Sequence, residues 1–391
     1  MLNLNSKGFI FFILLLLSSP ALSLTGIFGL GFFPNEKIAI LLVALSKYSW
    51  DIRYKQLRLF GFVCASILTL MFFLQLIAST NGILRASINS IVIFASIPLY
   101  YSFFSNRPQT VMKLLFYIGV MQCLISLIQV YFSMNGNQEM IEFFKNAPQN
   151  DYYFLSSEAG FWYRTSGLFF ESSGYALFQW VAIISGLKIG IYKKNLGKFL
   201  LFIMFVEVIL NGSLTGYLFA LGFFGIDFLR AFQNKKRILK LFFAIPFLIF
   251  TLYFLQVNNY YDIMGFYPKL LSQFDFLNNE YSYAPSRLRG MIESISYSFA
   301  SDNIMFGNGF TWLNPTLDFY SLYLRAYGLF GFIAIILFLL ALIRKAPLNY
   351  QIAVFLALSI NGHLSSVTNI ILLSLPMVFF KMEQLTKSDE K

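Results

Sequence analysis

Long apolar runs recur along almost the whole chain, and they limit the folds it can adopt more than any other feature. Between residues 9 and 380, runs of the length needed to cross a lipid bilayer alternate with short polar clusters. Of the 391 residues, 58% are hydrophobic and only 12% are charged, and the mean hydropathy is +0.66. This pattern predicts an all-α, polytopic integral membrane protein embedded in a lipid bilayer.

We expect about 12 transmembrane helices, and at least about 10 because several of the runs are short. The predicted spans are 9–24, 36–47, 59–78, 87–104, 114–134, 171–191, 199–211, 214–229, 241–256, 319–343, 350–362 and 367–380. They divide the chain into N-terminal helices (1–134), central helices (171–256) and C-terminal helices (317–391), separated by two long loops (135–170 and 257–316). Residues 7–23 also have the form of a signal peptide, but we expect an uncleaved first span.

The distribution of lysine and arginine predicts the orientation of the chain in the membrane. Most of the 29 basic residues fall into every second connection between the spans. Cytoplasmic loops carry such an excess of positive charge, so both termini are predicted to be cytoplasmic and both long loops to lie outside. The membrane topology then accounts for the net charge of +11, and no nucleic-acid partner is needed.

The second long loop contains an amphipathic segment that starts at Ser286. Leu288 and Ile292 are spaced as on one helix face, and Arg287 and Arg289 lie in the first turn. A cation at that end of a helix costs roughly 0.3 to 1 kcal/mol, whereas a bound phosphate or pyrophosphate would be stabilised by both guanidinium groups. The segment is therefore either an anion site or a helix lying on the membrane surface among lipid headgroups.

The end of the first long loop carries a recognisable motif. It reads Arg164-Thr-Ser-Gly-Leu-Phe-Phe-Glu171, followed by Ser172-Ser173. This resembles the RxxGxFxEPS signature of bacterial O-antigen and exopolysaccharide repeat-unit polymerases (Wzy-type), which belong to one superfamily with the O-antigen ligases. The chain departs from the signature at one point, because Ser172 stands where a proline is usual.

The second loop and the span after it add to the resemblance. The Phe306-Gly-Asn-Gly309 turn and the Gly328-Leu-Phe-Gly331 sequence are similar to the C-terminal core of these polymerases and ligases. The similarity covers roughly residues 160–345, and the rest of the chain matches only in its expected topology. The ligases characteristically carry a loop histidine near the position of Asp318; none occurs here, which favours the polymerase.

The resemblance implies glycosyl transfer at the outer face of the bacterial cytoplasmic (inner) membrane. A growing O-antigen, capsule or exopolysaccharide chain, linked through pyrophosphate to undecaprenol, would be moved onto a hydroxyl of a new lipid-linked repeat unit. Such an enzyme needs no cofactor and no metal, and it would work beside a flippase and a chain-length regulator. Guanidinium groups suit the pyrophosphate, and the expected binding residues are Arg164, Arg287, Arg289 and Arg325.

Two carboxylates at the boundary between loop and span are candidates for the catalytic base. Glu171 and Asp318 could each accept the proton of the attacking hydroxyl, because partial burial raises the pKa of a carboxyl group. Each has a structural alternative. Glu171 could pair with Arg164, and Asp318 could be the N-cap of the helix that follows.

Further residues are expected near the site. The residues expected to line it are Tyr163, Trp312, Tyr323 and His363. Clustered tyrosine and tryptophan in the loops equally suits the membrane interface, and His363 could be a packed residue in a broken segment. Arg325 has an alternative as well, an ion pair with Glu207 or Asp227 within the spans.

Three other functions remain as alternatives. An O-antigen ligase would transfer the chain to the lipid A core in place of another repeat unit. A flippase or exporter of lipid-linked oligosaccharide would show inverted repeats and charged residues spread through the spans, whereas here arginines and aromatic residues are concentrated in two external loops. The last alternative is a membrane protein whose loops only bind a partner.

Overall fold

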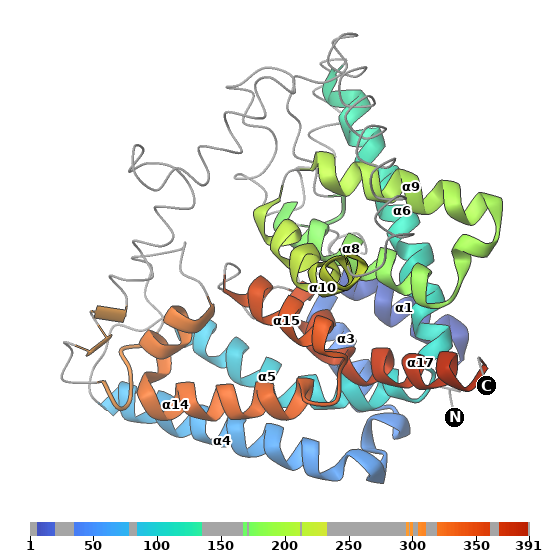
Figure 1. Cartoon of the computed structure of the whole chain (residues 1–391). Coiled ribbons are helices and arrows are strands. Elements are labelled where there is room, and N and C mark those ends of the chain that lie inside the picture. The colour runs from blue at the N-terminus through green and yellow to red at the C-terminus, as the bar shows by residue number, and fades with distance from the viewer. Residues whose placement is uncertain are drawn as a thin grey trace, which may run out of the picture.

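The computed structural model describes residues 6–19, 35–77, 84–134, 167–169, 172–211, 213–232, 295–296, 298–299, 304–309, 319–359 and 367–389. Within these ranges the chain is all-helical (Figure 1). The α-helices are α1 (Lys7–Ser18), α3 (Asn35–Ala44), α4 (Lys55–Ile77), α5 (Leu84–Ser105), α6 (Pro108–Met134), α8 (Ser172–Lys188), α9 (Asn195–Leu210), α10 (Leu214–Phe232), α14 (Phe319–Ile343), α15 (Leu348–Leu358), α16 (Val367–Ser374) and α17 (Pro376–Asp389). Three short 3₁₀ helices connect some of them: η1 (Lys47–Trp50), η2 (Ile52–Tyr54) and η4 (Ile191–Lys193).

The expected number of spans is corrected by the helix lengths. Four of the described helical segments are long and apolar enough to cross a membrane: Ile52–Ile77, Ser87–Ser105, Pro108–Phe132 and Phe319–Ile343. The other predicted spans in the described ranges are also helical, and most of these helices are shorter. α15, for example, has 11 residues, which rise only about 17 Å against a hydrocarbon core of about 30 Å. The predicted span 241–256 lies outside the described residues.

The last predicted span, 367–380, is divided into two helices. α16 ends at Ser374 and α17 begins at Pro376. Proline is tolerated at the first position of a helix, but inside a helix it removes a backbone hydrogen bond and clashes with the preceding turn. The division is therefore a local effect of Pro376.

The helices approach one another closely where small residues face each other. At the contact of α6 with α8, a Cβ added to Gly119 would lie 2.3 Å from the Cβ of Ala182. At the contact of α10 with α15, a Cβ added to Gly222 would lie 2.7 Å from the Cα of Ala353. Small residues at such contacts are typical of helix packing inside membranes, where close backbone approach replaces the hydrophobic driving force.

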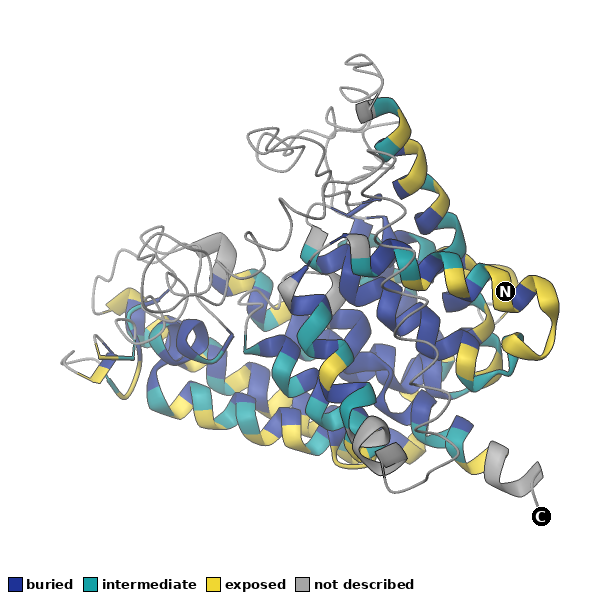
Figure 2. Ribbon diagram, turned by 45° about the horizontal axis from the view of Figure 1, so that its top comes forward, coloured by how far each residue is buried: buried dark blue, intermediate teal, exposed yellow. Residues whose placement is uncertain are grey.

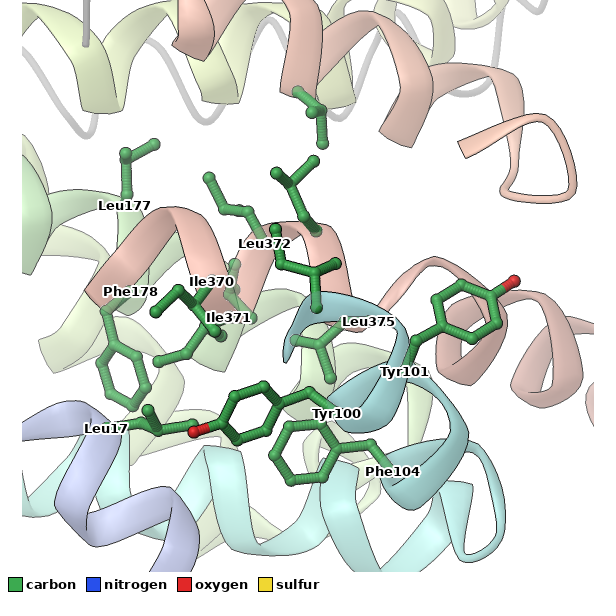
Figure 3. Close-up of a cluster of buried hydrophobic side chains, with 14 of the residues drawn as sticks. Leu17, Tyr100, Tyr101, Phe104, Leu177, Phe178, Ile370, Ile371, Leu372 and Leu375 are labelled. Atoms are coloured by element: carbon green, nitrogen blue, oxygen red, sulfur yellow. The ribbon is translucent and has the colours of Figure 1, made fainter. Parts of the chain in front are cut away.

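A continuous apolar core joins helices from both ends of the chain. In the part shown in Figure 3, Leu17 of α1, Tyr100 and Phe104 of α5, Phe178 of α8 and Ile371 of α16 lie together. The rings of Tyr100 and Phe104 stack with their centroids 5.9 Å apart, and both residues are fully buried. The N-terminal and C-terminal helices therefore share one core.

The outer helices carry apolar side chains on their exposed faces. Figure 2 shows a buried centre surrounded by helices on which exposed and buried residues alternate. On α4 the exposed apolar residues include Leu59, Phe60, Leu70, Phe73 and Leu76, at 50–62% exposure. A soluble monomer rarely exposes so much contiguous apolar surface, whereas a lipid-facing helix does.

Candidate functional site

The motif at the end of the first long loop is attached to α6 by two buried glutamines. Gln129 Nε2 donates to the carbonyl oxygen of Gly167 (2.8 Å), and the Gly167 amide donates to Gln129 Oε1 (3.1 Å). Gln122 Oε1 accepts from the amide of Leu168 (2.9 Å), and its Nε2 donates to the carbonyl oxygen of Ser18 at the end of α1 (2.7 Å). The segment that leads to Glu171 is therefore held at both Gly167 and Leu168.

The backbone at position 167 requires a glycine. Its φ is +54°, in the left-handed region, and a Cβ there would lie 2.6 Å from Gln122 Oε1. The ring of Phe169 packs against Tyr175 and Phe178 of α8, with centroids 6.3 and 5.4 Å away, and Phe169 is 3% exposed. The glycine and the phenylalanine of the motif thus have a packing role in this chain.

A buried carboxylate lies behind the same turn. Glu207 of α9 is 7% exposed and accepts hydrogen bonds from Ser126 of α6 (2.5 Å) and from the hydroxyl of Tyr175 of α8 (2.7 Å). The ring of Tyr175 in turn lies against Gly167. Glu207 therefore joins α6, α8 and α9 at the point where the first motif is attached.

The two parts of the second motif form one backbone assembly. The amides of Asn308 and Gly309 donate to the carbonyl oxygens of Arg325 and Ala326 (2.9 and 3.1 Å). In the opposite direction, the amides of Leu329 and Phe330 donate to the carbonyl oxygens of Ile304 and Met305 (2.9 and 3.3 Å). The turn at 304–309 is thus bonded to both sides of a break in α14, although the two segments are far apart in the sequence.

The break in α14 occurs at Gly328, whose φ and ψ are +64° and −170°. A Cβ on Gly328 would lie 2.4 Å from the amide nitrogen of Gly307, and a Cβ on Gly307 would lie 2.4 Å from that of Gly328. Gln75 of α4 completes the assembly, because its Nε2 donates to the carbonyl oxygens of both Phe306 (2.8 Å) and Ala326 (2.6 Å). The turn at 304–309 thus contacts α4 and α14. The described residues of the first motif, 167–169, contact α6 and α8.

Two of the predicted site residues lie in the described part of the chain. Arg325 is half-buried in α14, just before the break, and its carbonyl oxygen is bonded to the 304–309 turn. Tyr323 is 1% exposed and packs against Phe94 of α5, with its hydroxyl 3.4 Å from that of Ser90. Tyr323 is thus part of the contact between α5 and α14, and its role in lining a site stays a prediction.

The alternative ion pair between Arg325 and Glu207 stays a prediction. The carboxylate of Glu207 accepts hydrogen bonds from Ser126 and Tyr175, and elsewhere in the described part of the chain an ion pair joins Arg53 to Asp51 (2.6 Å). The other alternative, Asp227, has a side chain outside the described set. The Arg53 pair lies away from both motifs, and the Arg53 guanidinium lowers the pKa of the Asp51 carboxyl below its ordinary value.

The remaining predicted site residues lie outside the described residues. They are Arg164, Glu171, Arg287, Arg289, Asp318, His363, Tyr163 and Trp312. Part of the predicted amphipathic helix is described, and residues 295–296 and 298–299 are helical as expected, with Ser298 buried and Phe299 exposed. In the described ranges, no three His, Cys, Asp or Glu side chains are grouped so that they could hold a metal ion.

The buried amides were not singled out from the sequence. Gln75, Gln122 and Gln129 lie inside apolar runs, where a polar side chain is costly unless it is hydrogen-bonded. Ser126 shares the helical spacing of Gln122 and Gln129, so these polar residues form one stripe along α6. Such a stripe in an apolar run is the signal that could have identified them.

Comparison with protein-family models, with curated proteins and with solved structures finds no match to this chain.

Proposed function

We propose that the chain is an integral membrane glycosyltransferase that joins undecaprenyl-pyrophosphate-linked oligosaccharide repeat units into a polysaccharide. The reaction takes place at the outer face of the bacterial cytoplasmic membrane, with both termini of the chain in the cytoplasm. The four helices of spanning length in the described part of the chain and the exposed apolar face of α4 support the location in a membrane. The motifs of the two long loops support the reaction.

One observation carries the proposal: the described part of each motif is bonded to the apolar bundle by buried amides. Gln122 and Gln129 hold the turn at Gly167–Phe169, and Gln75 holds the turn at 304–309 against α14. A catalytic group must be kept within a fraction of an ångström of its working position, and it is kept there best by rigid elements. Loops that only contacted a partner would not need such anchoring at the ends that carry the motif.

The chemistry uses charges that the chain itself provides. An acceptor hydroxyl attacks the anomeric carbon of the donor sugar, the bond from that carbon to the pyrophosphate oxygen breaks, and the hydroxyl proton passes to Glu171 or Asp318. Arg164, Arg287, Arg289 and Arg325 bind the pyrophosphate and stabilise the negative charge that develops as it leaves. The pyrophosphate carries the activation, so the reaction needs no nucleotide on the outer side.

Deletion of the chain in its host tests the proposal. Surface glycan and lipid-linked intermediates are separated by length on a gel. A single repeat unit still attached to its final acceptor is the expected product, because export and ligation continue without the polymerase. Long polymer accumulating on undecaprenyl pyrophosphate would instead assign the chain as the ligase, and unflipped repeat units would assign it as the exporter.

A pair of substitutions tests the reaction more directly. Glu171→Gln removes a candidate base and is expected to reduce polymer length far more than Glu207→Gln, a change in a carboxylate buried among α6, α8 and α9. The amount of protein in the membrane is measured for both variants. Equal loss of polymer at equal protein amounts would mean that Glu171 acts through structure and not as a base.

A further inference from the structure

An apolar groove of about 360 Å³ lies where α8, η4, α9 and α10 meet. Its walls include Ile183 and Leu187 of α8, Phe202 and Phe205 of α9, and Phe224 of α10. Leu187, Phe202 and Phe205 are 38–48% exposed, so the groove opens to the surroundings of the protein. No described residue of either motif lines it.

Lysine residues cluster beside this groove. Lys198 lines it together with Tyr192, and Lys193 and Lys194 are exposed beside them, on η4 and before α9. No hydrogen bond or ion pair joins the side-chain ammonium group of any of the three lysines to another described residue. The groove therefore combines apolar walls with positive charge beside Lys198 and Tyr192.

The corner that holds these lysines is closely packed. A Cβ added to Gly197 would lie 2.1 Å from the carbonyl oxygen of Ile191, so only glycine lets the start of α9 pack against η4. The amides of Lys193 and Lys194 donate to the carbonyl oxygens of Gly190 and Ile191 (3.0 and 3.1 Å). This packing keeps Lys193 next to Tyr192 in the chain and Lys194 one helical turn before Lys198, and Tyr192 and Lys198 both line the groove.

We propose that the groove binds an anionic phospholipid of the membrane, with an acyl chain along the aromatic wall and the phosphate group at the lysines. An acyl chain matches the apolar walls, and several uncompensated positive charges favour a headgroup with net negative charge over a zwitterionic one. The inference requires that the chain lie in a membrane, but it does not depend on the glycosyl transfer proposed above. The predicted orientation also separates the two sites, because these lysines belong to the cytoplasmic set and the loop arginines to the outer side.

Native mass spectrometry of the full chain in detergent tests this site, with phosphatidylglycerol and phosphatidylcholine titrated separately. We expect the unmodified chain to bind phosphatidylglycerol more tightly than phosphatidylcholine. The triple variant Lys193→Gln, Lys194→Gln, Lys198→Gln should weaken phosphatidylglycerol binding by about five-fold for each lysine and leave phosphatidylcholine binding unchanged. The matched control is Lys55→Gln, an exposed lysine at the start of α4 that does not line the groove, which should change neither affinity.

A groove-filling variant tests the apolar half of the site. Leu187→Trp adds volume at an exposed position of the wall and should weaken the binding of both lipids. Equal affinity of the unmodified chain for the two lipids, an effect of Lys55→Gln as large as that of one groove lysine, or no effect of Leu187→Trp would each overturn the proposal. Displacement of phosphatidylglycerol by a lower concentration of a polyprenyl pyrophosphate would also overturn it, because the groove would then belong to the substrate lipid.

Discussion

At the scale of single residues, buried amides fix the loop ends to the apolar bundle. A glutamine offers a donor and an acceptor at the end of a flexible side chain, so it can satisfy backbone groups that have no helical partner. Gln129 donates one hydrogen bond to the backbone of Gly167 and accepts another from it, and Gln75 donates to two carbonyl oxygens at once. Without such partners, backbone groups in an apolar surrounding would each cost roughly 1 to 3 kcal/mol.

Gly167→Ala tests the attachment of the first motif. The change places a Cβ 2.6 Å from Gln122 Oε1 and 2.9 Å from the ring of Tyr175, at a φ of +54°. We expect a loss of stability of about 2 kcal/mol or more, from the left-handed backbone and the steric overlap together. Thermal denaturation of the full chain in detergent measures it.

The matched control for Gly167→Ala is Gly225→Ala in α10. There an added Cβ would meet only the side chain of Leu221, at 3.9 Å, so the change should be neutral or stabilise the helix by up to about 1 kcal/mol. If both variants melted at the same temperature, the turn at Gly167 would not have the backbone conformation described here.

A double-mutant cycle tests the link between Glu207 and Tyr175. Glu207→Leu leaves the hydroxyls of Tyr175 and Ser126 without this acceptor and should destabilise the chain by about 3 kcal/mol. Adding Tyr175→Phe should then cost about 1 to 2 kcal/mol less than it does in the unmodified chain, because its bond to Glu207 is already absent. Thermal denaturation of the single and double variants gives the coupling.

Tyr350→Phe is the control for this cycle. The Tyr350 hydroxyl donates to the carbonyl oxygen of Leu372 (2.7 Å), at the contact of α15 with α16 and not at Glu207. Its effect should add to that of Glu207→Leu within about 0.5 kcal/mol. Additivity of Glu207→Leu with Tyr175→Phe as well would show that the carboxylate and the phenol do not interact.

At the scale of elements, α14 is two half-helices joined at Gly328. The carbonyl oxygens of Arg325 and Ala326 end one half, the amides of Leu329 and Phe330 begin the next, and the turn at 304–309 bonds to both. A break in an apolar helix is tolerated only where other groups satisfy the freed backbone. The turn supplies these groups, so the break and the turn depend on each other.

Gly328→Ala should destabilise this assembly by about 3 kcal/mol or more, because its φ and ψ are open only to glycine and an added Cβ would meet the backbone of Gly307. Hydrogen exchange measures the local effect, and the amides of Asn308 and Leu329 should exchange faster in the variant. The amides of α10 are the internal reference and should keep their rates. Unchanged protection at Asn308 would mean that α14 does not bond to the turn.

Comparison of α14 with its prediction shows what a sequence pattern can and cannot determine. The run of apolar residues predicted a helix over 319–343, and these are the bounds of α14, because helix position follows from local hydrophobicity and spacing. The break at Gly328 was not predicted, since it depends on a turn that is distant in the sequence. The same reason explains why the partners of Gln75 and Gln129 were missed.

The number of spans shows a second limit of the sequence pattern. Apolar runs predicted where helices occur, and every predicted span in the described ranges is helical for most of its length. Composition alone did not separate a helix that crosses a bilayer from a shorter one packed inside a bundle, such as α15 or α16. Of the predicted site residues, only Arg325 and Tyr323 are described, so the proposed chemistry stays a prediction.

At the scale of the whole molecule, apolar side chains are exposed where a soluble helical protein would expose polar ones. The core joins α1, α5, α8 and α16, while exposed leucine and phenylalanine side chains cover the outer face of α4. In water this surface would favour aggregation, whereas in a bilayer it contacts acyl chains at no cost. Replacing an exposed apolar residue of α4 by lysine should therefore destabilise the chain in a bilayer but not in water.

Val63→Lys distinguishes the two settings. Val63 is 49% exposed near the middle of α4, so a lysine there would face hydrocarbon in a membrane and should cost about 2.5 to 3.5 kcal/mol on insertion. The yield of membrane-inserted, folded chain measures this cost. Ile52→Lys is the control, because Ile52 is 81% exposed in η2, before α4 begins, where a lysine can reach water or headgroups. A helix facing water would accept both lysines equally, so equal yields of the two variants would contradict the membrane location of α4.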